Sequence, residues 1–141
     1  MSDSGDAKTR ALALKADGNA AYKAKRFPEA VEKYSAAIAL DASEITFYTN
    51  LAAVHFETKD YAQCVEQCER AVEVGRENRA DFKMIAKALA RAGTAHKRAG
   101  DLRKAKTAFE KALTEHRTPE YKLTLSEVMP TFNHCLVSSN L

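Results

Sequence analysis

The stretch FPEAVEKYSAAI, residues 27–38, recurs in two altered copies within this chain of 141 residues. The copy YAQCVEQCERAV follows 34 positions later at 61–72, and the copy LRKAKTAFEKAL follows after a further 41 positions at 102–113. In all three, small and apolar residues recur three and four positions apart, which places them on one face of an α-helix. A fixed period of this length predicts a repeat protein, in which each unit is one supersecondary structure.

A second helix precedes the repeated stretch in each unit. Gly18, Ala52 and Gly93 occupy the same small position in the three copies, and no window has the strict alternation of a half-buried strand. Gly100 and Asp101 read as the end of one helix and the N-cap of the next. The sequence therefore predicts an all-α protein with helices at 9–25 and 28–41, 45–58 and 61–75, 81–99 and 102–115, and a shorter helix at 119–128. The seven extra residues of the longer interval fall near 76–84.

This pattern resembles the tetratricopeptide repeat, a helix–turn–helix unit of 34 residues. The matches to that family in the first and third copies are Gly18, Ala30, Tyr34 and Ala37, and Gly93, Ala105, Phe109 and Ala112. The second copy departs from it, with Ala52 for glycine and with Cys64 and Cys68 for the small and aromatic residues. The resemblance implies a right-handed α-solenoid of three helix pairs plus a C-terminal capping helix, because a single pair cannot bury its own apolar faces.

Three further stretches narrow the resemblance. VGRENRAD at 74–81, IAKA at 85–88 and HRTP at 116–119 are similar to the middle repeat domain of the Hop/Sti co-chaperones, which organise heat-shock proteins 70 and 90. In that subfamily the domain clamps two carboxylates of the C-terminal Met-Glu-Glu-Val-Asp of heat-shock protein 90. The resemblance implies the same clamp here, at Lys15, Asn19, Asn50, Lys87 and Arg91.

The chemistry of these five side chains suits a carboxylate ligand. Lys15 and Asn19 are four residues apart, as are Lys87 and Arg91, so each pair shares a helix face. Lysine offers a mobile charge, arginine a rigid fork of donors, and asparagine uncharged donors. Taken singly, each residue is better interpreted as a solvated position on a helix, the ordinary place of Lys and Arg. The prediction rests on all five lying at matching positions of the repeat.

The same resemblance implies contacts to the peptide upstream of its last residue. It assigns apolar contacts to Tyr22 and Ala53, and polar contacts to Thr46 and Glu57. Plain packing between helices is an equal alternative for Tyr22. Thr94 departs from the subfamily, which commonly has asparagine at that position. This departure leaves the tail of heat-shock protein 70 as an alternative partner to that of heat-shock protein 90.

Composition and charge argue against several other classes of protein. A formal net charge of +3 suits an acidic peptide, whereas nucleic-acid binding usually needs a dense basic patch. No stretch resembles a secretory signal or a membrane span. The odd number of cysteines, three, indicates a reducing compartment. We therefore expect a cytoplasmic, monomeric domain with no nucleic-acid or membrane partner.

No group of residues predicts catalysis or metal binding. Cys64 and Cys68 share a helix face, but no second pair completes a metal site, so packing in the core is the better interpretation. His134 and Cys135 are adjacent and lack an orienting acid or an oxyanion loop. We expect no enzyme activity, no metal and no cofactor. The alternatives to a chaperone-tail receptor are a scaffold that reads no free carboxylate and, with little support, a hydrolase or thiol enzyme.

The chain divides into three parts. Residues 1–8 are expected to form a disordered leader, 9–129 the three-repeat domain with its capping helix, and 130–141 a tail of unknown structure. Pro130 is expected to end the last helix. The sequence leaves open whether the chain is a fragment of a larger co-chaperone or a short natural relative.

Overall fold

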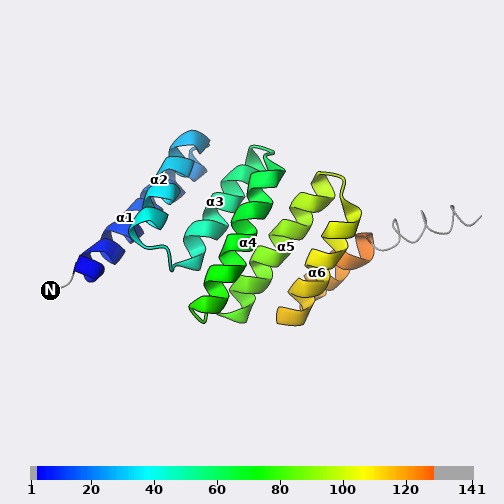
Figure 1. Cartoon of the computed structure of the whole chain (residues 1–141). Helices are drawn as coiled ribbons and strands as arrows, with labels where there is room; N and C mark the ends of the chain where they lie inside the picture. Colours follow the sequence, from blue (N-terminus) through cyan, green and yellow to red (C-terminus); the bar gives the residue numbers. More distant parts are fainter. Residues whose placement is uncertain (1–2, 129–141) are drawn as a thin grey trace, which may run out of the picture.

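The computed structural model describes residues 3–128, and their side chains from residue 5 onward. Figure 1 shows helices in a row along the chain, and a further helix over 119–128 closes the row. The labelled helices are α1 (Asp3–Lys23), α2 (Phe27–Leu40), α3 (Ile45–Glu57), α4 (Tyr61–Glu77), α5 (Phe82–Arg98) and α6 (Leu102–Glu115). Residues 3–128 contain no strand, so the all-α prediction is confirmed.

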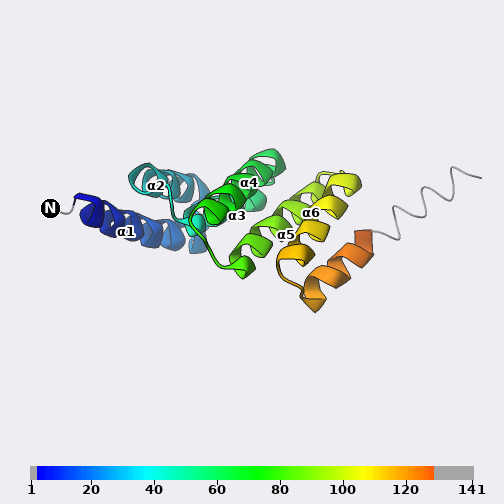
Figure 2. The same ribbon diagram turned by 60° about the horizontal axis from the view of Figure 1, so that its bottom comes forward.

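The helices form three stacked pairs. Each helix packs against the next one in sequence, and α3 also contacts both α1 and α5. Figure 2, a second view of the same array, again shows the pairs following one another in order. Stacking of this kind lets each pair bury its apolar face against a neighbour. As a result, α1, α3 and α5, the first helices of the pairs, lie next to one another and present one continuous surface.

Within the first and third pairs, a ring fills the space that a glycine leaves open. A Cβ atom on Gly18 would lie 2.6 Å from Cε1 of Tyr34, and one on Gly93 would lie 2.8 Å from Cε1 of Phe109. Both rings are buried, with 2% and 1% of their surface exposed, so they have little room to move aside. The small positions of the repeat therefore set how closely the two helices approach.

The second pair meets the same packing demand with smaller residues. Ala52, Cys64 and Cys68 are fully buried in one cluster with Ala92 and Ala95. A thiol in place of the ring leaves room for the methyl group that replaces the glycine. Both thiols are free, and the hydrogen bond with Cys64, reinforced by burial, raises the pKa of Cys68 far above its ordinary value. The prediction that these cysteines are packing residues is confirmed.

The turn inside each pair has one conformation in all three copies. Lys25, Lys59 and Gly100 occupy equivalent positions with φ of 61°, 64° and 89°, the left-handed region that commonly ends a helix. Asp60 and Asp101 follow, and each accepts a hydrogen bond from a backbone N–H of the next helix. The predicted helix end at Gly100 and cap at Asp101 are confirmed, and Asp60 has the same role in the second pair.

The seven extra residues of the longer interval lengthen one helix of the second pair and one of the third. α4 has 17 residues against 14 in α2, and α5 has 17 against 13 in α3. The connection from α4 to α5 has the same length as the connection from α2 to α3. At the far end of the longer α4, Nη2 of Arg76 lies 2.6 Å from Oε1 of Glu115 in α6.

The observed helix bounds agree with the predicted ones to within two residues except at α1. That helix begins at Asp3 and so overlaps the expected leader. Asp6 suits this position because a carboxylate near a helix N-terminus interacts favourably with its dipole, and Thr9 donates a hydrogen bond to the carbonyl oxygen of Gly5 at 2.9 Å. The expected tail over 130–141 and the predicted stop at Pro130 lie outside the described residues.

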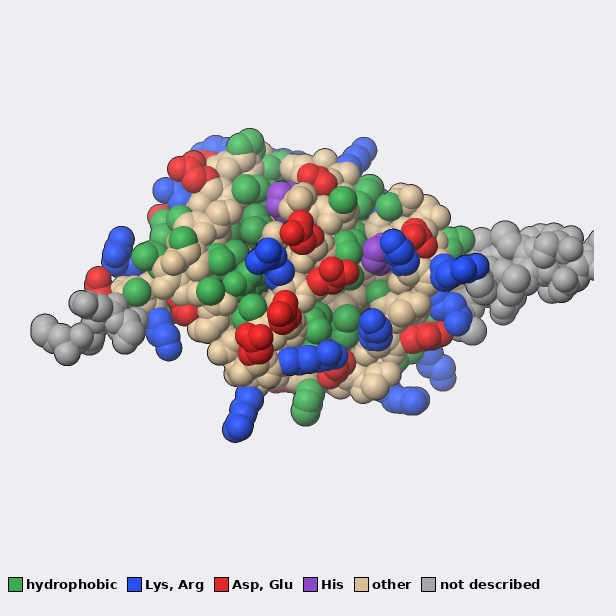
Figure 3. All heavy atoms as spheres, in the orientation of Figure 1, with side chains coloured by type: hydrophobic (Ala, Val, Ile, Leu, Met, Phe, Trp, Pro, Cys, Tyr) green, Lys and Arg blue, Asp and Glu red, His purple; other side chains and the backbone are tan. Residues whose placement is uncertain are grey.

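Charges of both signs are interspersed over the face seen in Figure 3. Surface ion pairs of the protein include Lys106 with Glu110 at 2.8 Å. No helix within residues 3–128 is long and apolar enough to cross a membrane.

Candidate functional site

The repeat brings the predicted site residues into register on α1, α3 and α5. Asn19, Ala53 and Thr94 occupy one equivalent position in the three units, and Asn50 and Arg91 occupy another. Because these three helices lie next to one another, residues at equivalent positions face a common surface. Two cavities open on this surface, and together they contain eight of the ten predicted residues.

The first cavity, which we call the amide cavity, lies between α1, α3 and α5 and has a volume of about 300 Å³. Its lining residues are Asn19, Tyr22, Lys23, Tyr34, Asn50, Ala53 and Arg91. Three of the five predicted clamp residues and two of the predicted upstream contacts therefore meet here.

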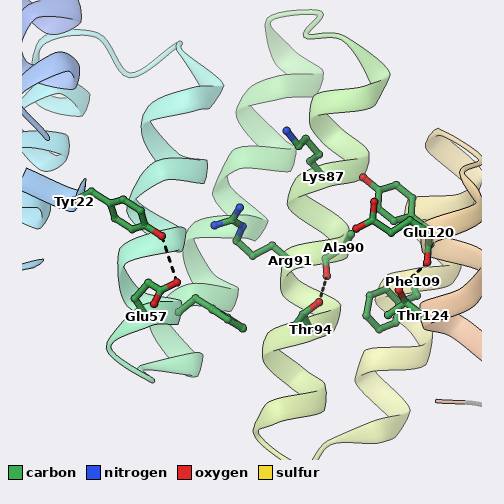
Figure 4. A pocket seen from close by; sticks show the side chains of 11 residues that line it. Tyr22, Glu57, Lys87, Ala90, Arg91, Thr94, Phe109, Glu120 and Thr124 are labelled. Carbon is green, nitrogen blue, oxygen red and sulfur yellow. Dashed lines mark hydrogen bonds between the residues drawn. The ribbon is translucent and has the colours of Figure 1, made fainter. Parts of the chain in front are cut away.

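The second cavity, which we call the end cavity, lies between the first cavity and the helix over 119–128 and has a volume of about 390 Å³. Its lining residues are Tyr22, Phe56, Glu57, Lys87, Ala90, Arg91, Thr94, Phe109, Glu120, Tyr121 and Thr124. In Figure 4, Tyr22 and Glu57 lie on one side, Glu120 and Thr124 on the other, and Lys87 and Arg91 between them. Tyr22 and Arg91 line both cavities, which therefore form one groove.

Hydrogen bonds within the fold fix the direction of the Asn19 amide. Its Oδ1 accepts from the hydroxyl of Tyr34 at 2.5 Å and from Nδ2 of Asn50 at 3.4 Å. With its oxygen occupied, the Asn19 amide offers only N–H donors to a molecule in the cavity. The Asn19 amide therefore presents donors to the amide cavity beside the Arg91 guanidinium, which favours an anionic ligand.

The three predicted cations are available to a ligand. Within residues 3–128, Lys15, Lys87 and Arg91 take part in neither an ion pair nor a side-chain hydrogen bond, although other lysines and arginines do. Arg91 is half-buried and Lys87 is exposed. Lys15 is half-buried on α1, one turn before Asn19, and lines neither cavity.

Two predicted polar contacts are used within the fold. The hydroxyl of Thr94 donates to the carbonyl oxygen of Ala90 at 3.0 Å. Thr46 lines neither cavity, and its hydroxyl donates to Oε1 of Glu44 at 3.2 Å. Both hydroxyl protons are therefore engaged with the protein rather than directed at the groove.

Tyr22 and Glu57 form the border between the cavities. The Tyr22 hydroxyl donates to Oε1 of Glu57 at 3.4 Å, and burial, followed by the charge of Glu57, raises the pKa of Tyr22. The Tyr22 ring also packs edge-to-face on Phe27, with centroids 5.9 Å apart. The packing interpretation of Tyr22 is therefore confirmed, and its contact to a peptide stays a prediction that its place in the groove wall permits.

Several lining residues were not among the site residues predicted from the sequence. Phe56 is the copy of Tyr22 one repeat later, and Tyr34 and Phe109 are copies of each other, so the repeat register could have identified all three. Glu120 and its neighbours in the last helix lie outside the repeats. For those residues the sequence carried no comparable signal.

Comparison with known proteins places the chain in a family. Models of the tetratricopeptide repeat match residues 18–59 and 43–114. Stress-induced-phosphoprotein 1 of Caenorhabditis elegans is 53% identical over 118 residues, which are 84% of this chain and 37% of that protein. The chain is a tetratricopeptide repeat (TPR) domain of the Hop/Sti co-chaperone family. The TPR domain spans only about a third of that relative, and 21% of the Hsp70-Hsp90 organizing protein of Triticum aestivum, to which it is 49% identical.

Solved structures of similar TPR domains have the same fold. The N-terminal domain of stress-induced protein-1 from C. elegans superposes with a TM-score of 0.85 at 51% identity, covering 87% of this chain and 97% of that one. The TPR2AB-domain:pHSP90-complex of yeast Sti1 gives 0.85 at 38% identity, covering 93% of this chain and 50% of that one. The first TPR of Spaghetti (RPAP3), bound to the HSP90 peptide SRMEEVD, has a TM-score of 0.78 at 26% sequence identity. The match covers 89% of this chain and 95% of that one. The second TPR domain of human RPAP3, in complex with the HSP70 peptide SGPTIEEVD, has a TM-score of 0.76 at 27% sequence identity. The match covers 87% of this chain and 98% of that one.

Proposed function

We propose that this TPR domain is a two-carboxylate clamp that binds the C-terminal Glu-Glu-Val-Asp of heat-shock protein 90. The observation that carries the proposal is a set of donors beside one cavity: Lys87 and Arg91 line the groove without a partner among residues 3–128, next to an asparagine whose oxygen is already occupied. A C-terminal aspartate matches this groove because it carries two carboxylates a few bonds apart.

The two carboxylates fit different parts of the groove. The amides of Asn19 and Asn50, with Lys15 beside them on α1, form a set of donors for the main-chain carboxylate. Lys87 and Arg91 approach from α5 and suit the carboxylate of the aspartate side chain. Hydrogen bonds between charged partners are about twice as strong as those between neutral groups, which suits a short peptide with a small interface.

The similar structures support this choice of ligand. Yeast Sti1, whose TPR structure is an HSP90 complex, and the RPAP3 TPR domains bound to SRMEEVD or SGPTIEEVD share the fold of this chain. Both peptides end in Glu-Glu-Val-Asp. We assign this chain to the middle, heat-shock protein 90-binding type of domain, acting in the cytoplasm by binding alone.

The preference between the two chaperone tails depends on the residue before Glu-Glu-Val-Asp. That residue is Met in SRMEEVD and Ile in SGPTIEEVD. An unbranched Met can enter a narrow space beside Tyr22, whereas a β-branched Ile is stiffer and wider near the backbone. A single misfitting apolar side chain changes affinity by about 1–3 kcal/mol, so we expect a preference of about ten- to a hundredfold for the heat-shock protein 90 tail.

Isothermal titration calorimetry with Met-Glu-Glu-Val-Asp as the free acid and as the C-terminal amide tests the proposal. We expect the free acid to bind with a Kd of about 1 µM, or about −8 kcal/mol, and the amide to bind hardly at all. Equal affinity for the two peptides would show that the domain binds partners without reading a free carboxylate.

A further inference from the structure

The end cavity has walls that a carboxylate clamp does not need. Aromatic rings of Tyr22 and Tyr121 line it together with two carboxylates, Glu57 and Glu120, and with Phe56, whose ring already has the Arg98 guanidinium 5.6 Å from its centroid. Glu120 is exposed on the last helix and forms no ion pair within residues 3–128. Rings together with carboxylates are the surroundings that a cationic side chain prefers, because both attract positive charge.

Binding of a ligand at the clamp makes the end cavity more favourable for a positive charge. Lys87 and Arg91 also line the end cavity, and without a ligand they offset the two glutamates. Once acidic groups of a peptide occupy these cations, Glu57 and Glu120 remain as the uncompensated charges. The second part of the groove is then favourable for a positive charge that follows on the same ligand.

We propose that the end cavity binds a basic side chain, preferably arginine, five residues before the C-terminal aspartate of the ligand, with Glu57 and Glu120 as its partners. The inference rests on the proposed function, because the clamp sets which peptide residue reaches the cavity. Arginine fits better than lysine because its planar guanidinium can stack on a ring while it donates to carboxylates.

The reach of an extended peptide agrees with this assignment. Five residues span at most about 17 Å, and packed helices lie about 8–10 Å apart. The distance from the clamp at α1, α3 and α5 to the last helix is therefore within reach of the fifth residue. The peptide SRMEEVD has arginine at this position, whereas SGPTIEEVD has threonine one residue before its Ile and no basic residue at all. Glu57 and Glu120 would thus add a charge-based preference to the one that depends on Met and Tyr22.

Four affinities test the proposal, measured by calorimetry at low ionic strength: SRMEEVD and SAMEEVD, each with the parent domain and with Glu120→Gln. We expect the change to Ala in the peptide to weaken binding to the parent about three- to tenfold. Glu120→Gln should weaken SRMEEVD by a similar factor and leave SAMEEVD unchanged or slightly tighter, because it removes a negative charge near an acidic peptide. Glu57→Gln should act in the same direction.

Glu73→Gln is the matched control, because it removes an exposed carboxylate that, like Glu120, forms no ion pair within residues 3–128 and that lies outside both cavities. It should leave all affinities unchanged. An equal effect of Glu120→Gln on both peptides, or no effect on SRMEEVD, would overturn the basic subsite. Failure of the clamp itself would appear differently, as equal binding of free-acid and amidated peptides.

Discussion

The amide cavity and the end cavity adjoin each other, share Tyr22 and Arg91, and are built in different ways. The amide cavity is closed by residues at repeat positions of α1, α2, α3 and α5, and hydrogen bonds within the fold direct its donors. The end cavity needs a helix outside the repeats, and it combines cations with carboxylates and rings. The repeat thus supplies the part of the groove that fits a common peptide end, whereas the last helix supplies residues that can distinguish one peptide from another.

The largest effect on binding is expected from residues that hold the carboxylates. Arg91→Ala and Lys87→Ala should each weaken binding of SRMEEVD and SGPTIEEVD by about 2–4 kcal/mol, because each leaves a desolvated carboxylate without its partner. The thermal midpoint should barely change, since alanine is well tolerated in a helix. Lys83→Ala, at an exposed position of α5 outside both cavities, is the control for titration calorimetry. Normal binding by either variant would remove that residue from the clamp.

A second experiment compares the glycines behind the two cavities. Gly18→Ala and Gly93→Ala should each destabilise the fold by about 1–3 kcal/mol, because the new methyl group overlaps the buried ring of Tyr34 or Phe109. In an unconstrained helix the same change stabilises by up to about 1 kcal/mol, so the sign itself is diagnostic. Urea unfolding measures the free energy of unfolding of both variants. A stabilised variant would mean that the ring moves aside and that the glycine does not set the helix spacing.

A smaller effect distinguishes the orientation of the Asn19 amide from the stability of the fold. Tyr34→Phe removes the hydroxyl that donates to Asn19, so the amide is no longer held and peptide binding should weaken by about 0.5–1.5 kcal/mol. Tyr48→Phe is the matched control: it removes a comparable hydrogen bond, to the carbonyl oxygen of Ala42 at 2.9 Å, away from both cavities. We expect Tyr48→Phe to lower the stability of the fold without changing the affinity for the peptide. If both variants bind like the parent, the Asn19 amide needs no such support.

The smallest effect is expected at Thr94. Its hydroxyl donates to its own helix, so Thr94→Val should leave the Kd for SRMEEVD unchanged within about a factor of two. Thr94→Asn, by contrast, places a longer donor beside the end cavity and should tighten binding. A clear loss of affinity in Thr94→Val would show that the hydroxyl turns toward the peptide when the groove is occupied.

The sequence predicted the fold well because the determinants of the fold repeat. The periods of 34 and 41 residues, the small positions at Gly18 and Gly93 and the caps at Asp60 and Asp101 are local signals, and each appears more than once. The start of α1 at Asp3 was missed because few residues there contact the core, so no apolar pattern marks the first turns. The seven extra residues were located but not recognised as longer helices.

The candidate site was predictable to the extent that it follows the repeat. The register brings Asn19, Asn50 and Arg91 to one cavity, as the motif predicts. The direction of the Asn19 amide depends on Tyr34, a contact between helices that no spacing reveals. Glu120 reaches the groove only because the last helix folds back against the third pair, and a position that occurs once carries no periodic signal.

The most direct test of the account is whether the amide cavity and the free C-terminus of the ligand are the two halves of one interaction. NMR titration, which also measures millimolar Kd values, can give the cost of amidating SRMEEVD in the parent domain and in Asn50→Ala. We predict that amidation costs less in the variant, with a coupling of about 1–2 kcal/mol, because the lost donor and the lost carboxylate oxygen are partners. The same cost in both proteins would mean that the carboxylate binds elsewhere and would contradict the account.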